Sequence, residues 1–233
     1  MRIPDRFPRE TGRDYALRVL KDNIVRLELE PGSMVSENEL SSALGLSRTP
    51  VREALIELSK VNIVEIYPQK GSRIALIDSH LVDQAYFMRD TLECEVIRDV
   101  CRKVTASDLD KLRTALRTQD IYVEMSRPGG SSNEPSFMEL DNQFHELLYV
   151  IAGKELVYRI IQEIVIHYDR IRNLTISYVT PQSVISQHWE LLDAIEKKDE
   201  KRARELMKKH LSRFQGIKKE LIEQHPDYFK DMS

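Results

Sequence analysis

The chain has 233 residues, of which 41% are apolar, 31% are charged and 7% are aromatic, and its formal net charge is −3. This composition suffices for a packed core, and no apolar run approaches the roughly 20 residues of a membrane span, so no membrane association is expected. The N-terminus lacks the apolar stretch of a secretory signal, which predicts a cytoplasmic protein. Because residues 1–78 carry 12 basic and 12 acidic side chains, any argument for nucleic-acid binding depends on where the basic residues stand.

The first elements in chain order are helices. Apolar residues at spacings of three and four predict a helix over residues 14–29, ended by Pro31. Ser36 and Glu39 have the spacing of a capping box and predict a short second helix, which Gly45 ends. The inward face of this second helix is expected to consist of Leu40, Ala43 and Leu44.

A third helix is predicted from Ser47 onward, with Pro50 tolerated in its first turn. Its buried stripe is expected to consist of Val51, Leu55 and Leu58. Two short alternating runs, residues 64–67 and 73–77, then flank a turn that contains proline and glycine. This pattern predicts a β-hairpin. Helix, helix-turn-helix and hairpin follow one another in the order of a winged helix.

The rest of the chain has helical periodicity almost throughout. Helices are predicted near residues 80–103, 106–125, 136–151, 154–176, 181–197 and 199–223. Residues 127–135 are predicted to form a loop, and those from Pro226 onward a loose tail. The sequence therefore predicts a mostly α protein of two domains. Residues 1–77 form a winged helix-turn-helix with a small β-hairpin wing, and residues 78–233 form an all-α antiparallel bundle of about six helices.

Cys94 and Cys101 are the two cysteines, and both fall in one predicted helix. Seven residues of helix rise roughly 10 Å, whereas a disulfide tolerates about 7 Å between Cα atoms. The two residues are therefore predicted to be small buried side chains that form no disulfide with each other.

The third helix carries basic side chains in its first turns. Arg48, Thr49 and Arg52 share the face opposite the buried stripe. The first turns of this helix reach base edges in a helix-turn-helix, and arginine can donate two hydrogen bonds to guanine. The hairpin adds three candidate contacts to the DNA backbone: Lys70, Gly71 and Arg73. A solvated helix face and a protein-binding winged helix are the alternatives. The order of the elements argues against the first, and the arginines in the first turn favour DNA over the second.

The run Ser47-Arg48-Thr49-Pro50-Val51-Arg52-Glu53-Ala54-Leu55 is long and specific. Together with Pro31-Gly32, Glu39-Leu40, Leu44-Gly45, Leu58 and Gly71, it makes residues 14–77 resemble the GntR family of bacterial regulators. The resemblance implies that Arg48, Thr49 and Arg52 contact the operator and that Gly71 lies in the wing. The chain departs from the family at Asn38, where some relatives have a basic residue, and at Asn62, where glycine is usual. Asparagine tolerates a positive φ, so the turn at residue 62 can persist.

Four polar residues of the helical region are predicted to point into the core. Asp141 and His145 are four residues apart on one helix face, and His188 and His210 each lie on an apolar stripe of another helix. A divalent metal would satisfy all four buried groups at once. The alternative is an Asp–His hydrogen bond beside two unrelated core histidines. His167 also lies on an apolar stripe.

Residues 80–214 resemble the all-helical FCD effector domain of the FadR-like branch of GntR regulators. The resemblance is carried by Arg89, Leu92-Glu93, Asp141-x-x-Phe144-His145, His188, Leu192, Ala194-Ile195, Asp199, Ala203, Met207 and His210-Leu211. It implies that Asp141, His145, His188 and His210 hold one divalent transition metal per chain, with zinc or nickel favoured. It also implies that Arg89 lines a pocket for a small carboxylate, which an arginine suits by its geometry. Three further candidates for that pocket are Tyr168, Arg172 and Asn173.

The leading hypothesis is a DNA-binding transcription regulator that is not an enzyme. We expect a homodimer on double-stranded DNA with a palindromic operator, whose affinity changes when a small carboxylate binds at the metal and Arg89. One alternative is a metal-dependent hydrolase with a DNA-binding appendage, and another is a regulator with a purely structural metal. Glu146 follows His145, but it would point about 100° away around the helix.

Overall fold

The structure is a computed structural model, and it describes residues 1–125, 136–175 and 180–230. The loop predicted at 127–135 therefore lies outside the described residues. The chain divides into two compact units: Met1–Asp83, Ile166–Leu174 and Lys219–Ser233 form the first, and Gln84–Val165 and Thr175–Lys218 form the second. Among the described helices, none combines the length and apolar character needed to cross a membrane.

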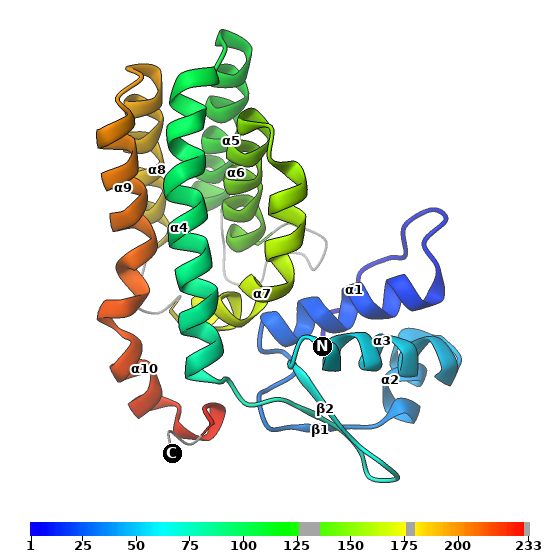
Figure 1. The fold of residues 1–233 in the computed structure, drawn as a ribbon. Helices are drawn as coiled ribbons and strands as arrows, with labels where there is room; N and C mark the ends of the chain where they lie inside the picture. The colour runs from blue at the N-terminus through cyan, green and yellow to red at the C-terminus, as the bar shows by residue number, and fades with distance from the viewer. Residues whose placement is uncertain (126–135, 176–179, 231–233) are drawn as a thin grey trace. The chain divides into compact units, whose positions relative to one another are not determined.

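The first unit contains a helix-turn-helix followed by a hairpin, as predicted (Figure 1). Its helices are α1 (Gly12–Val25), α2 (Glu37–Leu44) and α3 (Arg48–Lys60). Its strands are β1 (Met34–Val35), β2 (Val64–Tyr67) and β3 (Gly71–Ile74), and the antiparallel sheet has the order β1-β3-β2. The short strand β1 was not predicted, because a strand of two residues leaves no detectable alternation in the sequence.

Helix α1 is shorter than predicted. It ends at Val25 rather than near residue 29, because Leu27 has a positive φ of 61° that takes the chain out of the helix. Leu29 N–H instead bonds to the carbonyl of Asn23 at 3.1 Å. The helix is thus stopped by backbone hydrogen bonds within its own last turn, several residues before Pro31.

Helix α2 begins with the predicted capping box. Ser36 Oγ accepts from the Glu39 amide and Glu39 Oε2 accepts from the Ser36 amide, both at 3.2 Å. The helix ends at Gly45, which has a left-handed φ of 63°. The prediction that Ala43 faces inward was wrong, because Ala43 is exposed. An eight-residue helix offers one narrow contact face, and that face consists of Leu40, Ser41 and Leu44.

Helix α3 buries the predicted stripe of Val51, Leu55 and Leu58. Ser47 is its N-cap residue, but its side chain makes no capping hydrogen bond. After the helix, Asn62 adopts a φ of 58°, as its replacement of glycine required. The apolar face of α3 packs with residues of α1, β2 and β3 into one core.

Two distant segments complete the first unit. The first is Ile166–Leu174, in which Ile166 joins the core, Arg170 donates to the carbonyl of Ala75 at 2.6 Å and Asn173 donates to the carbonyl of Val25 at 2.7 Å. The second is the C-terminal segment. It was predicted to be loose from Pro226, and this was wrong: Phe229 is buried and forms a parallel bridge with Ile77.

The second unit is a bundle of helices (Figure 1). The helices that contribute to it are α4 (Ser79–Lys103), α5 (Ala106–Met125), α6 (Phe137–Ala152), α7 (Glu155–Leu174), α8 (Pro181–Glu196) and α9 (Glu200–Ser212). The predicted helix over 199–223 is divided: after α9 the chain forms a 3₁₀ turn (Arg213–Gly216) before α10 (Lys218–Gln224). Gly216 is a weak helix former and marks this break.

Cys94 and Cys101 lie in the core of the second unit, 3% and 0% exposed, and both are free, as predicted. Burial raises the pKa of the Cys94 thiol to about 12 and that of the Cys101 thiol to about 11. Both residues therefore remain protonated and are packed as small apolar side chains.

Candidate metal centre and nucleic-acid interface

The N-terminal turns of α3 present the predicted DNA-reading residues to solvent. The side chains of Arg48 and Arg52 are 60% and 59% exposed, and Thr49 is exposed as well. Both arginines bind one carboxylate, that of Glu37 at the start of α2. Arg52 holds it with two bonds, of 2.7 and 2.9 Å, and Arg48 with one of 3.1 Å.

Glu37 was not predicted to take part in this surface. The hydrogen bonds from Arg52, and then from Arg48, outweigh the effect of burial and lower the pKa of Glu37. Glu37 therefore stays ionised and orients the two guanidinium groups side by side. For Arg52 to read a guanine edge with both donors, it must first exchange Glu37 for the base.

The wing presents Lys70 to solvent at its tip, whereas Gly71 and Arg73 have structural roles as well. Gly71 has a φ of 101°, and a Cβ there would lie 3.0 Å from the carbonyl oxygen of Val35. Arg73 pairs across the hairpin with Glu65 through bonds of 3.0 and 2.7 Å. The three predicted wing contacts thus lie together on the hairpin, where Lys70 is exposed and Gly71 and Arg73 are partly buried.

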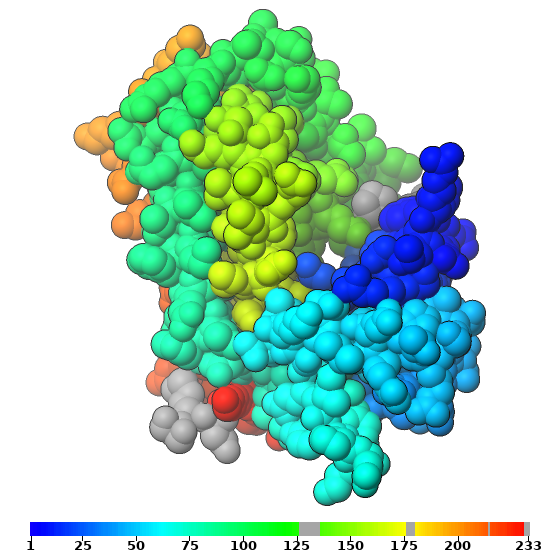
Figure 2. Space-filling model, turned by 45° about the vertical axis from the view of Figure 1, so that its right-hand side comes forward, coloured from blue at the N-terminus to red at the C-terminus, as the bar shows by residue number. Residues whose placement is uncertain are grey.

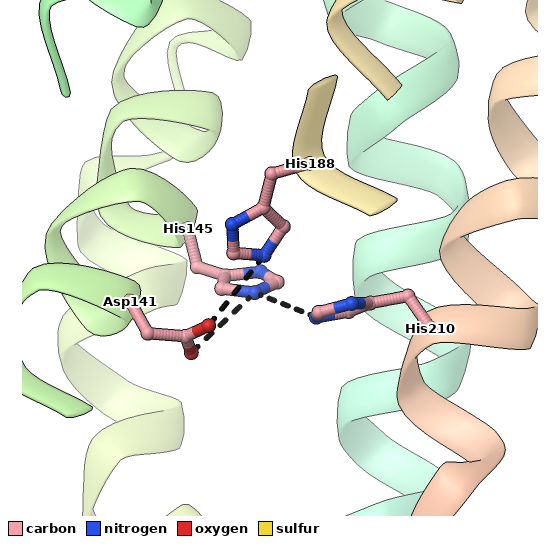
Figure 3. Close-up of side chains that lie close together, drawn as sticks. All are labelled: Asp141, His145, His188 and His210. Carbon is pink, nitrogen blue, oxygen red and sulfur yellow. Dashed lines mark hydrogen bonds and ion pairs between the residues drawn. The ribbon is translucent and has the colours of Figure 1, made fainter. Parts of the chain in front are cut away.

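Asp141, His145, His188 and His210 meet in the core of the second unit (Figure 3). The first two come from α6, the third from α8 and the fourth from α9. One ligand atom from each residue can be chosen so that all four lie within 4.8 Å of one another. His145 Nε2 lies 3.2 Å from His210 Nε2, and His188 Nε2 lies 3.5 Å from an Asp141 oxygen. All four residues are at least 95% buried.

The second ring nitrogen of each histidine faces an acceptor outside the cluster. Glu93 Oε2 lies 2.5 Å from His145 Nδ1, Gln119 Oε1 lies 3.0 Å from His188 Nδ1, and Gln187 Oε1 lies 3.1 Å from His210 Nδ1. Gln119 also donates to the carbonyl of Leu140, which fixes the orientation of its amide. In the tautomer that carries the proton on Nδ1, each Nε2 turns a lone pair toward the cluster.

Such an arrangement fits a cation. Burial first, and then His188 and His145, lower the pKa of His210 well below its ordinary value, so the His210 ring is neutral. Two Nε2 lone pairs 3.2 Å apart repel each other unless a proton or a metal ion lies between them. Three imidazoles and one carboxylate are a ligand set that zinc and other first-row metals accept.

Glu93 links the cluster to Arg89 on the same helix, α4. Its Oε1 accepts from Arg89 Nε at 2.5 Å, and both side chains are buried. Burial alone would raise the pKa of Glu93, but Arg89 and His145 together lower it to about 2. Arg89 and Glu93 therefore form a buried ion pair that contacts the candidate ligand His145.

A small cavity lies beside this buried ion pair. Its lining residues are Arg89, Glu93, Asn142, His145, Tyr158, Ile161, Gln162 and Val165. The space inside it is about 10 Å³, room for a group about the size of one water molecule, so a carboxylate enters only if side chains move. A larger and more open hollow, lined by Ser186, Trp189, Glu190, Asp193, Arg202 and Leu206, touches none of the four cluster residues.

Three residues suggested for this pocket lie elsewhere. Tyr168, Arg172 and Asn173 belong to the first compact unit, and α7 lines the cavity with Tyr158 and Gln162 instead. The error arose because helical periodicity gives the face on which a residue lies. It does not give the compact unit to which each part of a long helix belongs.

His167 and Glu146 lie where the sequence suggested. His167 is buried in the first unit, outside the cluster, and burial lowers its pKa. Glu146 is exposed although it follows His145 directly. No acid of α6 other than Asp141 therefore belongs to the cluster.

Two family models match the chain. The model described as FCD domain matches residues 84–213, and the model described as bacterial regulatory proteins, gntR family, matches residues 16–74. The first match covers the four candidate ligands and the cavity, and the second covers the helix-turn-helix and the wing.

Individual proteins match over most of their length. The HTH-type transcriptional repressor RspR of Escherichia coli is 30% identical over 96% of each chain. An uncharacterised HTH-type regulator of Streptomyces ambofaciens is 33% identical over 87% of this chain and 83% of its own. Among solved structures, E. coli McbR/YncC is similar with a TM-score of 0.73 and 20% identity, covering 92% of this chain and 99% of that one.

Proposed function

Because the chain belongs to the GntR family of DNA-binding transcription regulators and carries the FCD domain of that family, we propose that a small carboxylate and a divalent metal control its binding to DNA. The metal is held by Asp141, His145, His188 and His210. The carboxylate binds in the adjoining cavity. The protein acts as a homodimer on a palindromic operator, in the cytoplasm.

The convergence of three Nε2 atoms and one carboxylate carries this proposal. The Nδ1 atom of each histidine faces an oxygen of Glu93, Gln119 or Gln187. This pattern is the usual support of a metal-bound imidazole, in which the outer acceptor fixes the tautomer and the ring orientation. A cluster held only by hydrogen bonds would need one protonated imidazole, whereas a metal ion accepts all three lone pairs at once.

The cavity beside the cluster supports a small anion as the effector. A divalent ion and Arg89 together carry three positive charges, and Asp141 and Glu93 together carry two negative charges. The loaded site therefore has a net charge of plus one. Arg89 and His145 both line the cavity, so a carboxylate there meets a guanidinium and lies beside a metal ligand. Zinc or nickel suits this ligand set.

On the DNA side, we propose that Arg48, Thr49 and Arg52 read the major groove while Lys70, Gly71 and Arg73 meet the backbone. One such unit reads a half-site, and two copies related by a two-fold axis read a palindrome. Arg48 and Arg52 are exposed and lie together at the start of α3, which is the placement that base contacts require.

The proposal is tested by measuring operator affinity while short mono- and dicarboxylic acids are titrated. An operator is first obtained by selection from random double-stranded DNA with the zinc-loaded protein. We expect at least one acid to change the operator Kd by about 5- to 150-fold, the usual range of allosteric coupling. An acid that binds the protein, as seen by calorimetry, but leaves operator Kd unchanged would contradict the control mechanism.

Glu93→Gln is expected to weaken metal binding by about 10- to 100-fold, because the amide no longer offers the charged acceptor that holds His145. The measurement is a competition titration of zinc against a chromophoric chelator. Glu146→Gln is the matched control, since Glu146 is exposed and follows His145 in α6. Equal zinc affinities in the two variants would mean that Glu93 does not support the metal.

A further inference from the structure

The first half of α7 has an apolar stripe on its outer side. Leu156, Ile160 and Ile164 recur every four residues and are 61%, 58% and 36% exposed. Successive members are about 40° apart around the helix, so the three form one continuous strip. Ile161 and Val165, on the inner side, are buried. Figure 2 shows this part of α7, in yellow-green, uncovered at the surface of the second unit.

Opposite charges flank one side of this strip. Arg159 and Glu163 are both exposed, they are four residues apart, and they lie about 40° from each other around the helix. Within the part of the chain that the structure describes, neither side chain makes an ion pair or a side-chain hydrogen bond. The surface of α7 thus combines an apolar strip with one positive and one negative charge along the same edge.

We propose that two copies of the chain associate through this surface, with their α7 helices packed antiparallel around a two-fold axis near Ile160. On such an axis Ile160 packs against its own copy and Leu156 packs against the partner's Ile164. Arg159 meets the partner's Glu163, and the axis repeats each contact, so the interface has two such ion pairs. The inference gives the proposed homodimer its contact surface and rests to that extent on the proposed function.

The charge pattern favours a second copy over another protein. When two identical helices pack antiparallel about a two-fold axis, the same edge of each helix meets the same edge of the other. A positive residue on that edge then faces the negative residue of the other copy, whereas two like charges on the edge would repel across the interface. The apolar strip is self-complementary in the same way. Its more exposed end, at Leu156, meets the less exposed end of the copy, at Ile164.

The first test compares Ile160→Glu with Ile121→Glu by sedimentation equilibrium without DNA. Ile121 is 54% exposed on α5, so the control introduces the same charge at a similarly exposed isoleucine. We expect a dimer for the wild type and for Ile121→Glu, and a dimer Kd raised by at least about 100-fold for Ile160→Glu, since two apolar contacts are lost and two buried charges are added. A monomeric wild type, or equal dimer Kd in both variants, would overturn the proposal.

A charge exchange tests the orientation. Arg159→Glu and Glu163→Arg are each expected to weaken the dimer by about 3- to 10-fold, because each places like charges opposite one another. The double variant is expected to return to within about twofold of the wild type. Losses that simply add in the double variant would rule out the antiparallel pairing.

Crosslinking separates this inference from the proposed function. Ile160→Cys is expected to give a covalent dimer with a short bis-maleimide, while Ile121→Cys stays monomeric, and the native cysteines are buried and do not compete. A covalent dimer formed by a protein that fails to select DNA would leave the contact surface standing and remove the proposed function. Selection of a palindrome without crosslinking at Ile160→Cys would do the reverse and overturn the contact surface.

Discussion

Arg52→Ala is expected to weaken binding to a palindromic operator by about 30-fold to about 10⁴-fold. A bidentate contact between arginine and guanine contributes about 1–3 kcal/mol of discrimination, and a dimer makes it twice, which gives about 2–6 kcal/mol. Arg52 is largely exposed and its hydrogen-bond partner, Glu37, is near the surface. The substitution therefore removes a DNA contact without opening a cavity in the core.

The matched control for this prediction is Arg113→Ala. Arg113 lies on α5 in the second unit and pairs with Asp110 and Glu196, so its loss changes the net charge equally. Operator Kd is measured by fluorescence anisotropy at one fixed salt concentration, because such affinities depend steeply on salt. An Arg52→Ala protein that binds the operator as tightly as Arg113→Ala would remove Arg52 from the reading surface.

His188→Ala is expected to lower zinc affinity by at least about 10³-fold, beyond the roughly 10- to 100-fold that outer partners contribute. His188 is fully buried, its ring stacks on Phe144 at 4.3 Å, and Nδ1 is held by Gln119. The ring is thus held in place by its neighbours before metal binds. Because alanine leaves a cavity, His188→Gln is measured in parallel as the variant that fills the space.

Both variants are measured by competition with a chelator and by thermal unfolding with and without zinc. At a zinc concentration of about 100 times Kd, binding stabilises the wild type by about 2.7 kcal/mol, which corresponds to roughly 5–11 °C for a chain of this size. Neither variant is expected to show this shift. His225→Ala is the control, since His225 lies outside the cluster in the first unit. A full zinc shift in the His188 variants would show that zinc binds elsewhere.

Local patterns were enough to predict most elements and the burial of Asp141, His145, His188 and His210. The capping box at Ser36 and the apolar periodicity of α4 to α8 depend on neighbours a few residues away. The inward direction of Asp141 and His145 follows in the same way from their spacing on α6. That all four side chains meet at one point was expected from the family resemblance. Periodicity alone left open the alternative that the histidines are separate core residues with hydrogen-bond partners of their own.

The supporting contacts could not be predicted, because they join residues far apart in the chain. Glu93, Gln119 and Gln187 reach the histidines from α4, α5 and α8, at positions where nothing in the local sequence marks them. The pairing of Glu37 with Arg48 and Arg52 depends likewise on how two helix N-termini meet. A helical pattern gives the face on which a residue lies, and only the packing of helices gives its partner.

The C-terminal segment shows the same limit in the backbone. Its residues have the polar composition of a loose end, yet Ile77 N–H bonds to the carbonyl of Tyr228 at 2.8 Å and Lys230 N–H bonds to the carbonyl of Ile77 at 3.0 Å. One apolar residue, Phe229, buries its side chain at this point. One buried residue makes no repeating apolar pattern, so the sequence of this segment looks the same as that of a loose tail.

Elemental analysis of the purified protein tests the metal centre most directly. Wild-type protein incubated with zinc or nickel and then freed of unbound ions is expected to contain about one divalent ion per chain, and His188→Gln, treated identically, is expected to contain almost none. A folded wild type without bound metal would show that Asp141 and the three histidines form a hydrogen-bonded core cluster. Control by a metal-bound carboxylate would then be wrong, while the family assignment and the DNA-reading surface would stand.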